Sequence, residues 1–159
     1  MGVNMDKQQT NIVNNKKIKL NITTPRGLKF VEEADMIIMR CIDGNLGVLY
    51  GHAPVSTVLG DGILRIINDG VEKKLAIFGG IAEIGKETVN IFTTIAQHPE
   101  EIDLERAESD RKEVENAIEE RSKELQFQNS LVLLHRTLVR IEVSKHLKHL
   151  ENTEDYNDA

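Results

Sequence analysis

The sequence predicts an α+β fold in which an N-terminal antiparallel β-sandwich precedes a C-terminal antiparallel two-helix hairpin. Ten of the eleven glycines lie between Gly27 and Gly85, and glycine is the residue that tight turns between short strands most often need. Apolar residues alternate early in the chain and recur at helical spacing in its last third. Charge changes at the same place: residues 1–97 carry eleven Lys and Arg against ten Asp and Glu, whereas residues 98–159 carry nine against sixteen.

These changes divide the chain into four parts. Residues 1–15 are polar and aperiodic, which is typical of a disordered tail. Residues 16–98 form the predicted sandwich, and Pro99 marks its end because a proline disfavours helical geometry in the residue before it. Residues 99–150 form the predicted hairpin, and residues 151–159 form an acidic tail.

Six strands are expected in the sandwich. Residues 18–24 alternate apolar and polar side chains, as a strand with one buried face does. The other strands are expected at apolar runs separated by turn residues, at 36–41, 48–50, 63–67, 75–78 and 89–95. Turns are expected at 43–45, 60–62, 68–70, 79–80 and 85–86, and the Asp69-Gly70 pair favours a hairpin.

Two helices are expected in the last third. Asp103 is positioned to cap the first helix, whose apolar face carries Leu104, Ala107, Val114, Ile118 and Leu125. A polar stretch at 126–130 interrupts the pattern, and the second helix follows over 131–147 with its own apolar face, made of Leu131, Leu134, Leu138 and Ile141. Short helices with narrow apolar stripes are marginal alone, so the hairpin must rest on the sandwich or on a partner and can change its docking.

Composition argues against several functional classes. A net charge of −6 and the absence of tryptophan disfavour a nucleic-acid-binding surface. No apolar stretch is long enough to span a membrane, and the first residues lack the pattern of a secretion signal or transit peptide. The single cysteine, Cys41, lies in an apolar run and is expected to be a buried packing residue. No catalytic residue is identified, so the residues indicate a non-catalytic interaction protein.

Two histidines near the C-terminus are the best candidates for metal ligands. His146 and His149 lie three residues apart on the second predicted helix, a spacing that metal ligands can share. No third ligand is evident, and lysines flank both residues. We interpret them as solvated cations that suit the C-terminal end of a helix, and we predict no metal site.

Three segments together resemble the epsilon subunit of bacterial F-type ATP synthases. They are residues 44–54 (GNLGVLYGHAP), 60–66 (GDGILRI) and 76–84 (AIFGGIAEI), and their order and spacing agree with that family. The resemblance extends over about residues 16–146. The family's architecture is a β-sandwich followed by a helical hairpin, which is also the fold that glycine placement and periodicity indicate.

The resemblance implies a non-catalytic role in the central rotor stalk. The family's sandwich binds the gamma subunit and rests on the ring of c subunits, so that ion flow through the ring is coupled to ATP synthesis or hydrolysis in the catalytic head. The family's hairpin contacts the alpha/beta head transiently and can inhibit ATP hydrolysis. The implied location is peripheral, on the cytoplasmic side of the cell membrane, and the implied role requires no cofactor.

One motif in the hairpin resembles the ATP-binding motif of some bacterial epsilon subunits. Residues 102–107 (IDLERA) match that motif, and two arginines of the second helix match basic positions of the same site. The resemblance implies ATP as a regulatory ligand, with five residues around it: Asp103, Arg106, Ala107, Arg136 and Arg140. Because Arg136 and Arg140 are four residues apart on a helix, both guanidinium groups project from one face toward a common anion.

The chain also departs from the ATP-binding pattern. Gln97 stands where the family's site often has Glu, and Glu113 stands where ATP-binding members have Arg, so ATP binding is expected to be weak or absent. Asp103 serves equally as a helix cap and Arg106 as a partner of Asp110. The arginines of the second helix can instead meet an acidic segment of the family's beta subunit. A stand-alone nucleotide-binding regulatory domain is the alternative function.

Overall fold

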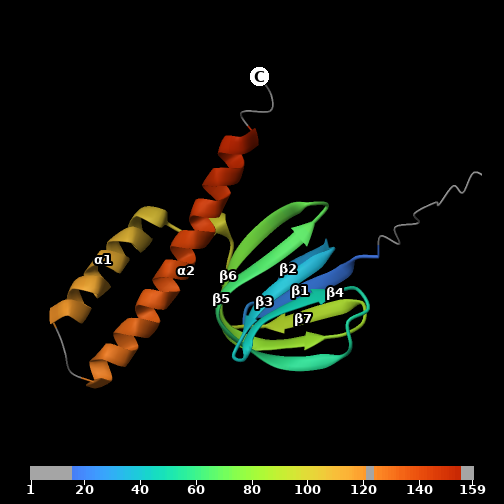
Figure 1. The fold of residues 1–159 in the computed structure, drawn as a ribbon, viewed down its shortest axis with the longest axis horizontal. Helices are drawn as coiled ribbons and strands as arrows, with labels where there is room; N and C mark the ends of the chain where they lie inside the picture. Colours follow the sequence, from blue (N-terminus) through green and yellow to red (C-terminus); the bar gives the residue numbers. More distant parts are fainter. Residues whose placement is uncertain (1–15, 121–123, 155–159) are drawn as a thin grey trace, which may run out of the picture.

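The structure is a computed structural model that describes residues 16–120 and 124–154 (Figure 1). The tail expectations for residues 1–15 and 155–159 lie outside the described residues. Within these two ranges, eight strands precede one short 3-10 helix and two α-helices. Their bounds are β1 Ile18–Thr24, β2 Gly27–Ala34, β3 Met36–Cys41, β4 Gly44–Leu49, β5 Val55–Asn68, β6 Val71–Ile84, β7 Thr88–Phe92, β8 Ala96–Gln97, η1 Pro99–Glu101, α1 Leu104–Glu120 and α2 Glu124–Glu154.

The strands form a curled sheet in the order β2-β1-β7-β6-β5-β3-β4, with β8 paired to β6. All pairs are antiparallel except β1 and β7, which run parallel with Lys19 opposite Thr88. The long strands β5 and β6 pair along nearly their whole length and belong to both layers of the sandwich (Figure 1). The predicted fold class is therefore confirmed, with one parallel pair that the sequence pattern does not indicate.

Two of the predicted turns are wrong, because their glycines bend strands instead of ending them. Residues 60–62 lie inside β5 and residues 79–80 inside β6. At Gly62 a Cβ would stand 2.8 Å from the Cβ of Arg40, and at Gly80, where φ is +127°, a Cβ would stand 2.3 Å from the carbonyl oxygen of Phe92. Only glycine allows the close approach that these bends require.

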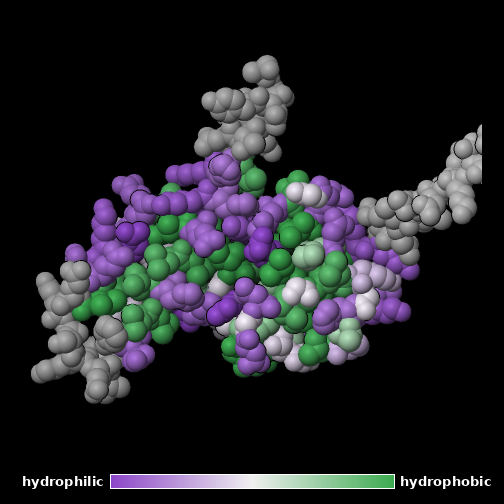
Figure 2. All heavy atoms as spheres, viewed as in Figure 1, coloured by the Kyte–Doolittle hydropathy of each residue, from purple (hydrophilic) through white to green (hydrophobic). Residues whose placement is uncertain are grey.

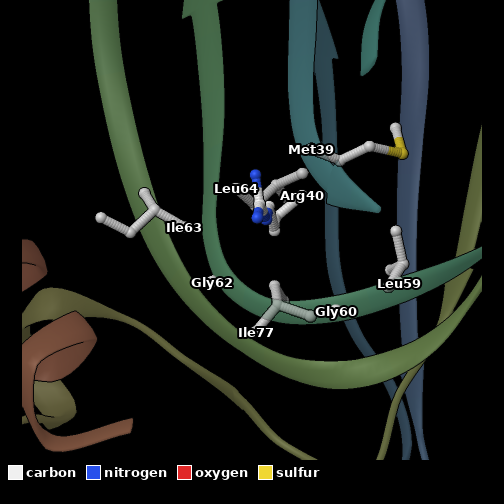
Figure 3. A pocket seen from close by; sticks show the side chains of 8 residues that line it. All are labelled: Met39, Arg40, Leu59, Gly60, Gly62, Ile63, Leu64 and Ile77. Atoms are coloured by element: carbon white, nitrogen blue, oxygen red, sulfur yellow. The ribbon is translucent and has the colours of Figure 1, made fainter. Parts of the chain in front are cut away.

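Figure 3 shows the bend of the two strands, with Gly60 and Gly62 on one and Ile77 on the other. A small cavity lies inside the bend and is lined by side chains that include Met39 and Leu64. Its volume is about 10 Å³, which leaves room for at most one water molecule. The bend is therefore a structural feature and not a ligand site.

Strand β2 carries no signal in the sequence because it is an edge strand. Of its eight residues only Ala34 is buried, so the apolar alternation that marks a half-buried strand is missing. The Asp69-Gly70 hairpin is confirmed, with φ of 51° and 79° at the two turn residues.

The core of the sandwich lies between its two layers. Ile18, Leu20 and Ile22 of β1 are completely buried there, as the alternating pattern predicts. Cys41 is also part of this core with an exposed fraction of 5%, which confirms the expectation of a buried packing residue. The sandwich thus has an apolar interior that is complete without the helices.

The helices form an antiparallel pair (Figure 1). The predicted break at 126–130 is wrong, because α2 begins at Glu124 and runs through it; Gln, Asn and Ser inside a helix each cost only up to about 0.7 kcal/mol. The helix also continues to Glu154, so residues 151–154 are helical where a tail is expected. Residues 121–123, between the helices, lie outside the described residues.

A second, smaller apolar cluster joins α2 to the sandwich. It consists of Ala76 and Phe78 of β6, Ile102, and Val139 and Val143 of α2. The neighbouring residues of β6, Leu75 and Ile77, belong to the sandwich core instead, because successive side chains of a strand point to opposite faces.

The predicted apolar face of α2 is only partly correct. Ile141 is buried, but Leu131 and Leu138 are 38% and 42% exposed, and together with Val132 and Leu133 they leave an apolar surface on the helix. Figure 2 shows hydrophobic residues gathered over this lower half of the hairpin. Residues 131–133 lie in the part of α2 that extends past the sandwich (Figure 1), whereas Leu138 is exposed although its neighbours Arg136 and Val139 contact the sandwich.

Candidate functional site

A cavity of about 330 Å³ lies where the hairpin meets the sandwich. We call it the junction cavity. Four of the five residues implied for ATP line it, namely Asp103, Arg106, Ala107 and Arg140; the rest of its lining consists of Gln97, Glu101, Ile102 and Asp110. The fifth candidate, Arg136, does not line the cavity.

The start of α1 is held by Asp103. Its Oδ1 accepts a hydrogen bond of 3.0 Å from the backbone N–H of Arg106, and its carbonyl accepts one of 2.9 Å from the N–H of Ala107. Asp103 is therefore the helix cap that the sequence predicts. Ala107 is buried, whereas Arg106 is exposed, and in the described part of the chain Arg106 forms no ion pair with Asp110. The Arg106 guanidinium is thus available to a ligand.

Arg140 bridges the two parts of the molecule. Its Nε donates a hydrogen bond of 2.7 Å to Oε1 of Gln97, and its guanidinium lies 4.6 Å from the ring centre of Phe78. Burial, reinforced by the positive charge of Arg136, lowers the pKa of Arg140 from its ordinary value, although Asp110 opposes the shift. The arginine remains a cation, since the pKa of a guanidinium is very high.

Arg136 holds the hairpin through a different acceptor. Its Nε and one terminal nitrogen donate to the two carboxylate oxygens of Asp61 at 2.6 and 3.4 Å, and its guanidinium lies 5.5 Å from the Phe78 ring centre. The two arginines therefore share one aromatic ring but have separate polar partners. Asp61 and Phe78 lie far from Arg136 in the sequence, and no spacing or motif indicates their role.

The charge of the junction cavity is not that of a strong phosphate site. Three carboxylates line it, those of Glu101, Asp103 and Asp110, against the guanidinium groups of Arg106 and Arg140. Burial opposes ionisation of Glu101, but hydrogen bonds from Lys29 Nζ at 2.9 Å and the backbone N–H of His98 at 2.8 Å outweigh it and hold the pKa of that carboxyl below its ordinary value. Glu101 is thus ionised and repels an anion.

The histidine pair at the end of α2 does not form a metal site in the described part of the chain, where no group of three potential ligands occurs. His146 is directed to the sandwich, and its Nε2 lies 3.1 Å from the carbonyl oxygen of Glu72. The expectation of a solvated side chain is therefore wrong for His146, because α2 docks on β6 at this point. Within the described ranges, neither helix is long and apolar enough to cross a bilayer.

These features define a class: a β-sandwich subunit with a C-terminal helical hairpin docked on its outer face. Residues 17–99 match the family model described as "ATP synthase, Delta/Epsilon chain, beta-sandwich domain". That match covers more than half of the chain, and curated relatives extend it into the hairpin. The chain belongs to the family of ATP synthase epsilon chains, which confirms the resemblance found in the sequence.

The relatives are bacterial proteins with about one third identical residues. The ATP synthase epsilon chain of Bacillus velezensis is 33% identical over 81% of this chain and 98% of its own. Those of Herpetosiphon aurantiacus and Caldicellulosiruptor saccharolyticus are 34% and 32% identical, over 80% and 79% of this chain and 94% and 91% of theirs. A chain in the cryo-EM structure of Euglena gracilis mitochondrial ATP synthase, OSCP/F1/c-ring in rotational state 1, has a TM-score of 0.60 and 25% identity, covering 94% of this chain and 89% of that one.

Proposed function

We propose that this chain is a non-catalytic rotor subunit in the central stalk of an F-type ATP synthase, where its sandwich binds the gamma subunit and rests on the c ring. The supporting observation is that sandwich and hairpin together correspond to nearly the whole of an ATP synthase chain from an assembly that includes the c ring. The proposed task is mechanical: the subunit fixes the joint through which torque passes between the ring and the catalytic head.

The location follows from the assembly. As part of an ATP synthase, the chain is a peripheral component of a membrane complex, and we place it on the cytoplasmic side. Purification from membranes tests this proposal, because the subunit should co-purify with gamma and the c ring. A native protein that stays monomeric and apart from those subunits would instead favour the alternative function, a stand-alone nucleotide-binding domain.

The hairpin is the proposed regulatory element. It is attached by a small apolar cluster and by the polar contacts of Arg136 and Arg140, separate from the sandwich core. Two packings of such an element can differ by only a few kcal/mol, so a docked state and an extended, inhibitory state are both accessible. Truncation after Gln97 should raise ATP hydrolysis by the reassembled complex. Unchanged hydrolysis, with the truncated chain present in normal amount, would refute the regulatory role.

For ATP, we propose weak binding or none in the junction cavity. The excess of carboxylates there and the ion pair that engages Arg136 both reduce the attraction for phosphate. Calorimetric titration of ATP into the full chain tests this, with Arg136→Ala plus Arg140→Ala as the probe. Arg111→Ala is the matched control, because Arg111 pairs with Glu115 on α1 outside the cavity. If the wild type and the double variant bound ATP with the same measurable affinity, neither arginine would belong to the ATP site.

A further inference from the structure

A second cavity, of about 270 Å³, lies at the other end of the hairpin–sandwich contact. We call it the distal cavity. Its apolar lining includes Phe30 of β2 and Leu75 of β6 from the sandwich, and Leu147 and Leu150 from α2. It is slightly smaller than the roughly 300–1,000 Å³ of typical small-molecule sites, so it suits a small ligand with an apolar body.

Four basic side chains line the same cavity. Lys73 and Lys74 come from β6, His98 from the segment before η1, and His146 from α2; Glu100 is the one carboxylate in the lining. The junction cavity has the opposite character, with carboxylates in excess. A small anion with an apolar body is therefore complementary to the distal cavity and not to the junction cavity.

The donors of the distal cavity are only partly engaged by the protein. Lys73 Nζ lies 2.5 Å from a carboxylate oxygen of Glu32, and Lys74 Nζ lies 3.4 Å from one of Glu142. An ammonium has three N–H groups, so one ion pair leaves it free to donate further bonds. The Nε2 of His146 faces the Glu72 carbonyl, which can only accept, so that nitrogen carries the hydrogen and fixes the orientation of the ring.

The distal cavity is composite, because α2 supplies one of its walls and the sandwich with its adjoining segment supplies the others. The sandwich supplies β2 and β6. Residues 98–103, the connector between β8 and α1, supply Pro99 and Glu100, and α2 supplies the remaining wall. Figure 1 shows α2 passing beside the connector at this level. If α2 left the sandwich, His146, Leu147 and Leu150 would leave the lining together, and the cavity would lose that whole wall.

We propose that the distal cavity binds a small carboxylate with a hydrocarbon body, of the medium-chain fatty acid class, and that this ligand stabilises the docked hairpin. The chain of the ligand lies against Phe30 and the two leucines of α2, while Lys74, which is on the face of β6 toward α2, receives the carboxylate. Because the ligand binds the docked state alone, it shifts the hairpin toward docking through that differential affinity. This inference is independent of the assembly proposed above, since it concerns a site within the chain itself.

The probe is octanoate, titrated by calorimetry into the full chain below the concentration at which it forms micelles. Octanol and octylamine are the chemical controls for the negative charge. The test variant is Lys74→Gln, which removes a mostly buried cation from the lining, and Leu150→Trp fills the cavity as a second variant. Lys145→Gln is the matched control, because Lys145 lies on α2 outside the lining and pairs with Glu108. Circular dichroism verifies that each variant is folded.

We expect octanoate to bind the wild type and the Lys145 variant with equal affinity. It should bind the Lys74 variant at least about tenfold more weakly, and it should not bind the Leu150 variant. Saturating octanoate should also slow amide exchange in the last turns of α2 and leave the exchange of β1 unchanged. The proposal is overturned if octanoate does not bind at millimolar concentration, if octanol binds equally well, or if Lys74→Gln has no more effect than Lys145→Gln. Binding with unaltered α2 exchange would overturn the link to docking.

Discussion

Val143 is the most informative single position for the attachment of the hairpin. It is completely buried, and it packs in the small cluster with Phe78 and Ala76 and not in the sandwich core. Val143→Ala removes two methyl groups whose burial contributes about 0.8 kcal/mol each, and the cavity left behind adds to the loss, so docking should weaken by about 2 kcal/mol. At 1.4 kcal/mol for each factor of ten, this is roughly a 30-fold shift of the docking equilibrium.

Native-state hydrogen exchange of the full chain measures this shift directly. Amides in the last turns of α2 should exchange roughly 30-fold faster in the Val143 variant, because they open when the hairpin leaves the sandwich. Amides of β1 and β7 should keep their protection, since their core does not include Val143. Leu133→Ala is the matched control: Leu133 lies on the same helix, is 49% exposed, and should change neither rate.

An equal change in exchange rate in the hairpin and in the sandwich would refute this reasoning. If Val143→Ala accelerated exchange in β1 and α2 by the same factor, the hairpin and the sandwich would unfold as a single cooperative unit. The separate small cluster would then not act as a release point, and a hairpin that moves independently of the sandwich would be excluded.

Three further perturbations have defined outcomes. Asp61→Asn weakens the two-point contact to Arg136, so the protection of the α2 amides against hydrogen exchange should fall by about 1 kcal/mol. Lys145→Gln breaks a more exposed ion pair, so in the same measurement the protection should change by less than about 0.5 kcal/mol. Gly80→Ala should lower the free energy of unfolding by at least about 2 kcal/mol in a denaturant titration, while Gly47→Ala, where a Cβ meets nothing, should be nearly neutral. A hydrogen bond from Arg65 lowers the pKa of Glu72 despite the partial burial of this carboxyl. The ionised Glu72 therefore stabilises the folded state above the ordinary glutamate pKa, and this stabilisation is lost as the pH falls through the lowered value. In an acid titration, Glu72→Gln should lose less free energy of unfolding than the wild type.

Much of the sandwich could be predicted because its signals are local. The alternation in residues 18–24 and the Asp69-Gly70 turn depend on neighbours in the sequence, and both are confirmed. The bends at Gly62 and Gly80 could not be distinguished from turns, because the need for glycine there comes from Arg40 and Phe92 on other strands. Edge strand β2 has no such local signal, because it buries almost nothing.

The candidate site shows the same limit. The helix cap at Asp103 follows from local spacing. The resemblance assigns Arg106 and Arg140 to one site, and in the structure both line the junction cavity. The partners of the arginines, Asp61 and Phe78, could not be predicted, since they depend on how α2 crosses β5 and β6.

The alternation of side chains along β6 has a consequence for the free subunit. When the hairpin is released, Phe78 becomes exposed on the strand, and Val139 and Val143 become exposed on the helix. These two surfaces are complementary, so the released hairpin of one copy can complete the sandwich of a second copy, the exchange of identical elements called domain swapping. Docking of the hairpin in the unassembled chain therefore also opposes this dimerisation.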